Sequence, residues 1–184
     1  MPNFRLIPPK SKLQDLAVGF GKEDSEEKAF EAGRAIANGS RSLENLLDIV
    51  RWKSARSEWH IRKNTSSQIT NALDAAATVA SSNSDENLVE ALNALQKLKG
   101  VGIPVASAIL TAINPERYTI IDFRALEALD YPRQDENFYI AYLNYCRDLA
   151  AQNVVSAQTE LPAPTPLRAL DRALWQWSYE QSNK

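Results

Sequence analysis

The sequence predicts an all-α protein of about eight helices. Apolar residues recur three or four positions apart over most of the chain, and no segment shows the convincing alternation of a β-strand. Residues that cap helices precede several of these stretches, and glycine or proline follows them. The 184 residues, 44% of them hydrophobic, suffice for one well-buried domain or a compact two-lobed one.

We expect the helices to form one domain over residues 23–184. Residues 1–22 should form an irregular N-terminal arm, because Pro2, Pro8 and Pro9 hinder helix formation. A proline-rich link over residues 158–166 precedes a C-terminal helix that should pack back on the domain. In chain order, helices are expected over residues 24–38, 42–60, 65–80, 85–98, 104–113, 123–131, 138–149 and 166–181.

Composition argues against several classes of protein. A net charge of −2 does not suit a protein that coats DNA through its overall charge, although it allows a local basic face. One cysteine and one histidine argue against a disulfide framework, a four-cysteine iron–sulfur cluster and a zinc site. Cys146 should be a small buried hydrophobe. Without a long apolar run or a signal-peptide core, we expect no membrane contact and a cytoplasmic location.

The most basic segment is RWKSARSEWHIRK, which holds five Lys or Arg, one Glu and two Trp in 13 residues. If one helix spans residues 42–60, then Trp52, Arg56 and Trp59 share a face. Basic residues interleaved with tryptophans suit phosphate contacts combined with stacking on an unpaired base. Alternatively, both tryptophans anchor the core and the charges only solvate the helix.

A glycine-rich turn at residues 98–103 separates two of the expected helices, and Pro104 suits the first turn of the second one. Glycine permits positive φ and lets another chain approach the backbone closely. Amides beside a helix N-terminus can point at an anion, so the turn is a candidate site for a DNA phosphate. Alternatively, it is an αα-corner whose glycines only permit close packing. The candidate DNA-binding residues here are Lys97, Lys99, Gly100, Val101, Gly102 and Ile103.

Asp122 follows the apolar pair Ile120-Ile121 and directly precedes an apolar helix. An aspartate in this place is a common N-cap. Its carboxylate could also stabilise a developing positive charge or orient an attacking water. The two roles are compatible, because a cap holds the carboxylate in place.

Together, residues 98–106 and Ile121-Asp122 resemble the core of the helix–hairpin–helix DNA glycosylases, the endonuclease III-like superfamily. Members carry L-P-G-V-G-x-K-x-A and then an apolar V-D passage, and the resemblance covers about a fifth of the chain. The family's catalytic aspartate falls on Asp122. The lysine of its lyase-active members falls on Pro104, 18 positions earlier.

The resemblance implies a two-lobed helical bundle around a cleft. The hairpin motif 86–113 and Asp122 would lie at its mouth, and the basic helix 42–60 would form part of the opposite wall. It further implies a monofunctional DNA glycosylase, in which water cleaves the N-glycosidic bond of a damaged or modified base flipped out of double-stranded DNA. No cofactor is implied, although the turn could hold a monovalent cation. The protein should act as a monomer, associated with the nucleoid if bacterial.

Two further groups of side chains complete this interpretation. The basic residues expected to contact DNA are Arg56, Arg62 and Lys63. The residues expected to form the base pocket are Trp52, Lys53, Trp59 and Tyr118. Lys53 could alternatively supply an amine nucleophile, and Tyr118 could simply be a packing residue. Arg124 could hold Asp122 through an ion pair or bind a phosphate.

Two other classes of function stay open. One is a non-catalytic DNA-binding or lesion-sensing module, and the other is a helical protein–protein adaptor whose glycine turn is structural. Salt-dependent DNA binding separates the adaptor from the rest, and release of free base separates the enzyme from the sensor. The motifs do not identify the base. Alkylated purines, oxidised or deaminated bases and bulky modified pyrimidines of phage DNA all fit, so repair and phage defence are both open.

Overall fold

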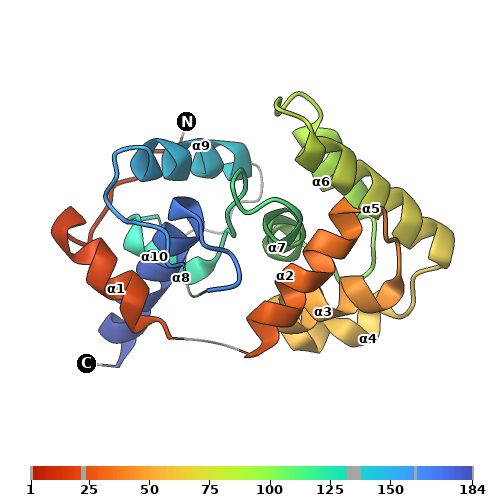
Figure 1. Cartoon of the computed structure of the whole chain (residues 1–184), viewed down its shortest axis with the longest axis horizontal. Helices are drawn as coiled ribbons and strands as arrows, with labels where there is room; N and C mark the ends of the chain where they lie inside the picture. Colours follow the sequence, from red (N-terminus) through yellow and green to blue (C-terminus); the bar gives the residue numbers. More distant parts are fainter. Residues whose placement is uncertain (1, 22–23, 132–137, 160, 184) are drawn as a thin grey trace. The chain divides into compact units, whose positions relative to one another are not determined.

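A computed structural model describes residues 2–21, 24–131, 138–159 and 161–183, and every regular element within them is a helix (Figure 1). The all-α prediction is therefore confirmed for this part of the chain. The chain divides into two compact units. We call Glu23–Tyr118 the hairpin unit, and Met1–Lys22 together with Thr119–Lys184 the terminal unit.

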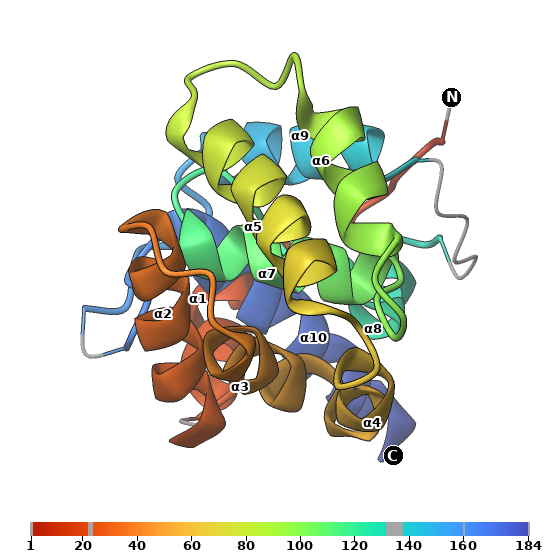
Figure 2. The ribbon, with the colours of Figure 1, turned by 90° about the vertical axis from the view of Figure 1, so that its right-hand side faces the viewer.

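The hairpin unit is built around one apolar helix. Its α-helices are α2 (Asp24–Ala37), α3 (Leu43–Ser54), α4 (Glu58–Ile61), α5 (Ser66–Ser81), α6 (Leu88–Gln96) and α7 (Ile103–Ile113). Every side chain of α7 except Pro104 is buried, and this helix packs against α2, α3, α5 and α6. Figure 2 shows α5 and α6 side by side next to α7. Burial of apolar area on α7 therefore stabilises this unit.

Side-chain caps fix where two of these helices begin. The Ser42 hydroxyl accepts a hydrogen bond from the Asn45 amide at 3.2 Å, at the start of α3. Thr65 and Gln68 form a reciprocal capping box at the start of α5, with bonds of 3.2 and 2.8 Å. Each pair satisfies amides that the first helical turn would otherwise leave without a partner.

The basic segment does not form the single helix expected over residues 42–60. Helix α3 ends at Ser54, whose φ of −159° and ψ of 75° are not helical, and a 3-10 turn, η2 (Ala55–Ser57), leads into α4. The Ser54 hydroxyl lies 3.0 Å from that of Ser57, on the other side of this break. Trp52, Arg56 and Trp59 therefore belong to three different elements and do not line one helical face.

Gly33 lets α2 approach the backbone of α7. A Cβ atom at this position would lie 1.9 Å from the Ala112 carbonyl oxygen and 2.2 Å from its carbon. No atom can occupy that space unless the two helices separate. The absence of a side chain at Gly33 is therefore a condition for the packing of the hairpin unit.

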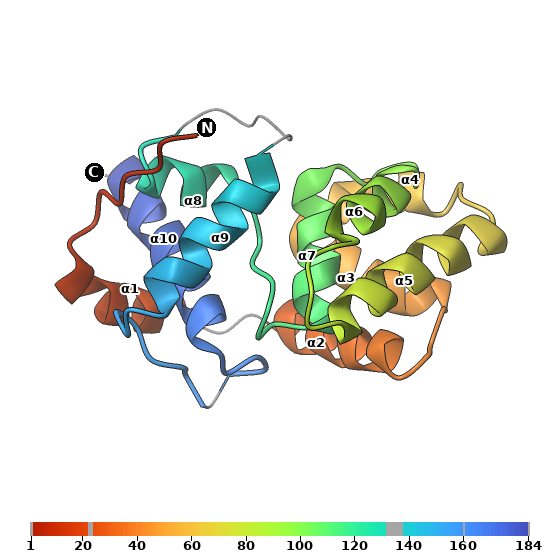
Figure 3. The same cartoon turned by 90° about the horizontal axis from the view of Figure 1, so that it is seen from above.

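The terminal unit is organised around its last helix. Its α-helices are α1 (Leu13–Gly19), α8 (Phe123–Ala128), α9 (Tyr139–Ala150) and α10 (Pro166–Ser182). Helix α10 packs against each of the other three, and Figure 3 shows α9 running beside it. Cys146 is buried on α9, as expected for a small hydrophobe, and burial raises the pKa of its thiol.

The N-terminal residues differ from the irregular arm expected over 1–22. Residues 13–19 form α1, which packs against α10, with Leu13, Leu16 and Ala17 buried. Ahead of it, the amides of Arg5 and Ile7 donate to carbonyls at the end of α8, at 3.0 and 2.9 Å. The prolines prevent a helix only as far as residue 9, and tertiary packing then decides the conformation of the residues that follow.

Replacing Gly33 by alanine should lower the free energy of unfolding by at least about 2 kcal/mol, because α2 must move away from α7. Gly19→Ala is the matched control, since its Cβ would meet only the Gln176 Cγ atom, at 3.9 Å. Urea unfolding followed by circular dichroism measures both variants. Equal stability of the two would show that the α2–α7 contact is not closely packed.

Candidate nucleic-acid interface

The glycine-rich turn joins α6 to α7 in the hairpin unit. Gly100 has a φ of +90°, in the region that favours glycine, whereas Gly102 is extended with a φ of −98°. Gly102 is the N-cap of α7 and brings no capping side chain, and Pro104 occupies the first turn. The side chains of Val101 and Ile103 are buried, so these two residues can offer a ligand only their backbone.

The turn rests directly on α4. A Cβ atom on Gly100 would lie 2.8 Å from the His60 Cβ atom and 3.1 Å from the Ser57 carbonyl oxygen. Gly100 therefore serves two purposes, positive φ and close packing. At Gly102 the nearest atom would be the Pro104 Cδ atom, at 3.8 Å, so neither requirement applies there.

Asn64 holds the turn and α4 together. Its side-chain nitrogen donates to the carbonyls of Ile61 (2.9 Å) and Lys99 (3.1 Å). Its side-chain oxygen accepts from the Lys99 amide at 2.9 Å. Sequence reasoning missed this residue, because its partner lies 35 positions away and no local pattern marks the pairing. Loss of such a buried, bidentate link costs about 1–3 kcal/mol.

Backbone donors and two lysines at the turn are available to a ligand. Within the described ranges, no hydrogen bond engages the amides of Gly100, Gly102 or Ile103, and no ion pair engages Lys97 or Lys99. Both lysine side chains are exposed. An uncapped helix N-terminus with neighbouring cations favours an anion.

The basic segment is partly neutralised by its own glutamate. The Glu58 carboxylate accepts from Arg51 at 2.9 Å and from Arg62 at 2.6 Å. Hydrogen bonds from Arg51, and then from Arg62, lower the pKa of Glu58 to about 2. Arg62, predicted to contact DNA, is therefore committed to Glu58, and its guanidinium also lies 3.7 Å from Glu44. The prediction counted this glutamate but did not foresee that it pairs with both arginines.

The remaining predicted residues around α4 are exposed. Trp59 is 68% exposed, and the Lys63 ammonium lies 4.7 Å from the centre of its ring. Arg56 is also exposed. Helix α4 carries the exposed Trp59 and packs against Gly100, so it lies next to the glycine turn in the hairpin unit. We call the turn together with residues 56–63 the turn surface.

Two predicted base-pocket residues are packed within the hairpin unit. Tyr118 is fully buried and its hydroxyl donates to the Val79 carbonyl at 3.2 Å, so the packing role applies and the base-pocket role does not. Trp52 is half-buried, with its ring 5.2 Å from that of Phe30, which makes it mainly a contact between α2 and α3. Lys53 is half-buried in the last turn of α3.

Asp122 lies in the terminal unit, at the N-cap of α8. Its carboxylate accepts from the Arg124 amide at 2.9 Å, and the side chain is half-buried. The Arg124 guanidinium does not pair with it. That group lies 5.1 Å from the Trp175 ring and 5.4 Å from the Tyr179 ring, and it donates to the hydroxyls of Ser178 and Ser182. The N-cap bond therefore helps to position the aspartate.

The described residues include no group of three or more His, Cys, Asp or Glu side chains placed to hold a metal ion. None of the helices in the described ranges has the length and apolar character needed to cross a bilayer. Comparison with models of protein families, with curated proteins and with solved structures gives no match.

Gly100→Ala should destabilise the protein by about 2 kcal/mol, because the residue has positive φ and no room for a Cβ atom. Gly102→Ala should cost less than about 1 kcal/mol, the loss expected for a weaker N-cap. Thermal unfolding of the two variants provides the comparison. Similar losses at both positions would mean that the turn does not rest on α4.

Glu58→Gln should strengthen DNA binding, because it removes the closest carboxylate from Arg62 on the turn surface, whereas Arg51 keeps its bond to Asp48 at 3.0 Å. The slope of log Kd against log salt concentration should steepen by up to about 1. Glu90→Gln, at the far end of α6, removes the same charge and is the control. Fluorescence anisotropy at several salt concentrations measures both variants, and equal effects would place Arg62 away from DNA.

The pH dependence of the wild type should follow from the lowered pKa of Glu58. A carboxylate with a lowered pKa contributes stability above its unfolded pKa and loses that contribution as the pH falls through about 2. Between pH 5 and 8 both ion pairs stay formed. Titration of Glu58 therefore does not release Arg62 in that range.

Proposed function

We propose that this protein is a monofunctional DNA glycosylase with a two-lobed helix–hairpin–helix fold. The observation that carries the proposal is the glycine turn before α7, with an uncapped N-terminus, two exposed lysines and backbone donors that no described residue uses. A turn of this kind suits a phosphate of the DNA backbone, which positions the protein without reading sequence.

The turn surface supplies the second part of the proposal. An unstacked base exposes an apolar face, and the exposed Trp59 ring offers it an aromatic surface for stacking. Lys63 above the ring and Arg56 nearby add positive charge for the phosphates on either side. Binding at this surface would therefore favour DNA whose target base has left the helix.

Asp122 is the proposed catalytic residue. Cleavage of the N-glycosidic bond leaves positive charge on the deoxyribose ring, and a nearby carboxylate stabilises that charge. The same carboxylate can orient the attacking water or accept its proton. The hydrogen bond that the carboxylate accepts from the Arg124 amide restrains it. Less conformational entropy is therefore lost when the transition state forms. The proposal requires Asp122 and the turn surface to contact the same DNA molecule.

The monofunctional assignment rests on Pro104. A lyase step needs an amine that attacks the sugar carbon and forms an imine, and proline offers neither a primary amine nor a backbone N–H. Pro104 instead occupies the first turn of α7, where its fixed φ favours the helix. Water would therefore be the nucleophile, and the strand would stay intact at an abasic site.

A non-catalytic DNA-binding module is the second candidate. It is favoured by the cap at Asp122, which by itself accounts for an aspartate at this position. The turn surface would then recognise damaged or unpaired DNA without cleaving it. Release of free base from a panel of natural and modified DNAs, measured by mass spectrometry, separates the two candidates.

Asp122→Asn should reduce base release at least about a hundredfold, because an amide cannot stabilise a cationic transition state. Asparagine caps helices as well as aspartate, so stability and DNA affinity should change little. Mass spectrometry of the released base and anisotropy with the same DNA provide the two measurements. Wild-type activity in this variant would mean that Asp122 acts only as the N-cap of α8.

Borohydride reduction tests the nucleophile. With water as nucleophile, no covalent protein–DNA adduct should form, and strand breaks should appear only after alkali or an added abasic-site nuclease. An adduct that disappears in Lys53→Ala but persists in Asp122→Asn would identify Lys53 as an amine nucleophile. The enzyme would then be bifunctional, and its amine would come from α3 instead of the position of Pro104.

A further inference from the structure

An arginine lies among three aromatic rings in the terminal unit, on α8 and α10. The Arg124 guanidinium carbon is 5.0 Å from the centre of the Phe123 ring on α8. It is 5.1 and 5.4 Å from the ring centres of Trp175 and Tyr179 on α10, which stack on each other with 14° between their planes. Phe123 and Tyr179 are each 45% exposed, so these four residues, the α8–α10 cluster, are open to a ligand.

One edge of the guanidinium is available for hydrogen bonds. Its Nη1 atom donates to the hydroxyls of Ser178 and Ser182, at 3.3 and 3.2 Å, which orients the plane of the group. Its Nε and Nη2 atoms donate to no residue that the structure describes, and neither atom is buried. These two N–H groups point in the same direction from the planar guanidinium. Arg124 can therefore bond to two neighbouring acceptor atoms of one ligand.

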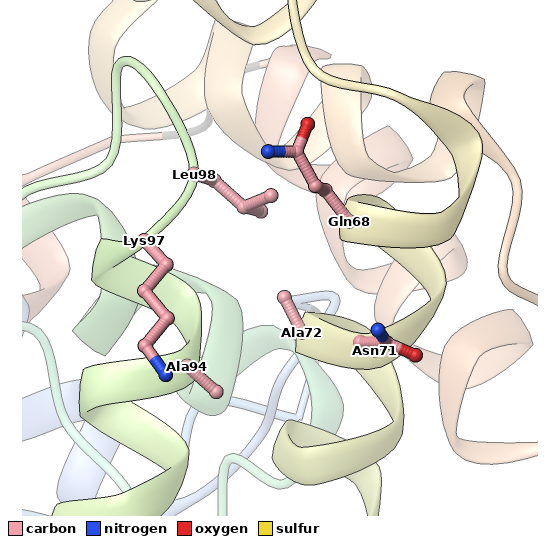
Figure 4. Close-up of a pocket in the computed structure, with 6 residues that line it drawn as sticks. All are labelled: Gln68, Asn71, Ala72, Ala94, Lys97 and Leu98. Atoms are coloured by element: carbon pink, nitrogen blue, oxygen red, sulfur yellow. The ribbon is translucent and has the colours of Figure 1, made fainter.

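The pocket between α5 and α6 of the hairpin unit lacks such convergence (Figure 4). Its volume is about 250 Å³, and its lining is mostly apolar. In Figure 4, the Lys97 ammonium lies at the Ala94 end, away from the Gln68 nitrogen. The Asn71 amide points away from the pocket. These polar groups therefore do not converge on one ligand, whereas the rings of the α8–α10 cluster lie close to the group that carries the donors.

Carboxylates near the α8–α10 cluster favour a neutral ligand over a phosphate. The Ser178 hydroxyl accepts from Arg124 and donates to the Glu127 carboxylate. The Asp122 carboxylate accepts from the Arg124 amide at 2.9 Å. Both carboxylates would repel a phosphate bound to the guanidinium, but they would not repel an uncharged base. Aromatic rings also suit a flat base, which they bind by stacking.

We propose that the α8–α10 cluster binds the target base and that Arg124 selects a base with two adjacent acceptor atoms. The inference rests on the proposed function, because it names the kind of base that Asp122 releases. Asp122 directly precedes Phe123, so the sugar of a nucleotide can lie at the carboxylate while its base lies against the exposed rings of Phe123 and Tyr179. The Nε and Nη2 atoms then donate to the edge of that base. The turn surface, with Trp59, contacts the strand beside it.

Two of the base classes that the motifs leave open carry this pair of acceptors. Deaminated purines have it at O6 and N7, and modified cytosines have it at N3 and O2. Alkylation at N7 removes one acceptor, and oxidation at C8 places a hydrogen on N7. Uracil-type bases separate their two oxygens by an N3–H donor. Guanine shares O6 and N7, but its intact base pair retains it in the helix.

Matched bases test the acceptor pair by affinity alone. Asp122→Asn serves as the background, since it should bind DNA without releasing the base. One pair of duplexes carries hypoxanthine or 7-deazahypoxanthine, which lacks the N7 acceptor. The other pair carries 5-hydroxymethylcytosine or 5-hydroxymethyluracil, which has N3–H. Fluorescence anisotropy should show at least about fivefold tighter binding to the first member of one pair, because its partner loses one of two hydrogen bonds. The pair that responds identifies the purine or the pyrimidine class.

Two further variants assign the preference to Arg124. Adding Arg124→Lys retains the charge but not the paired donors, so it should abolish the difference within the pair. Adding Arg147→Lys, the same change in a half-buried arginine of α9, should leave the difference intact, and that combination supports the inference. Equal affinities within both pairs, or a difference that survives Arg124→Lys, would overturn it. The proposed function then stands if the wild type still releases a base from the panel of DNAs. A wild type that releases no base refutes both.

Discussion

The hairpin unit depends on the burial of α7. Since almost every side chain of this helix is inside, its neighbours must approach it from several sides, and two glycines permit the closest contacts around it. Gly33 brings α2 onto the α7 backbone, and Gly100 brings the turn onto α4. The same packing that stabilises the unit therefore also fixes the N-terminus of α7, where an anion would bind.

On the hairpin unit, some basic side chains form ion pairs with a neighbouring carboxylate and others do not. Glu58 engages Arg51 and Arg62, whereas Lys97 and Lys99 have no ion pair among the described residues. In a protein with a net charge of −2, Lys97 and Lys99 thus remain available to an anion near the turn. Binding to DNA would then depend on where these few charges lie, more than on the total.

The terminal unit supplies Asp122 on a well-restrained helix start. Helix α8 packs against α10, and the aspartate is tied to the backbone of Arg124. Arg124 itself contacts aromatic rings and serine hydroxyls. A carboxylate that the backbone holds at a helix start suits the stabilisation of a cation.

The sequence by itself determined the helical class, the caps at Ser42, Thr65 and Asp122, and the turn between α6 and α7, because periodicity, capping and glycine act over a few residues. Only the tertiary structure decided the rest. It ended α3 at Ser54, buried Tyr118, committed Arg62 to Glu58 and turned residues 13–19 into a helix against α10. It also joined Asn64 to Lys99. These outcomes depend on partners that are distant in sequence or on competition among nearby charges, and a local pattern contains no information about either.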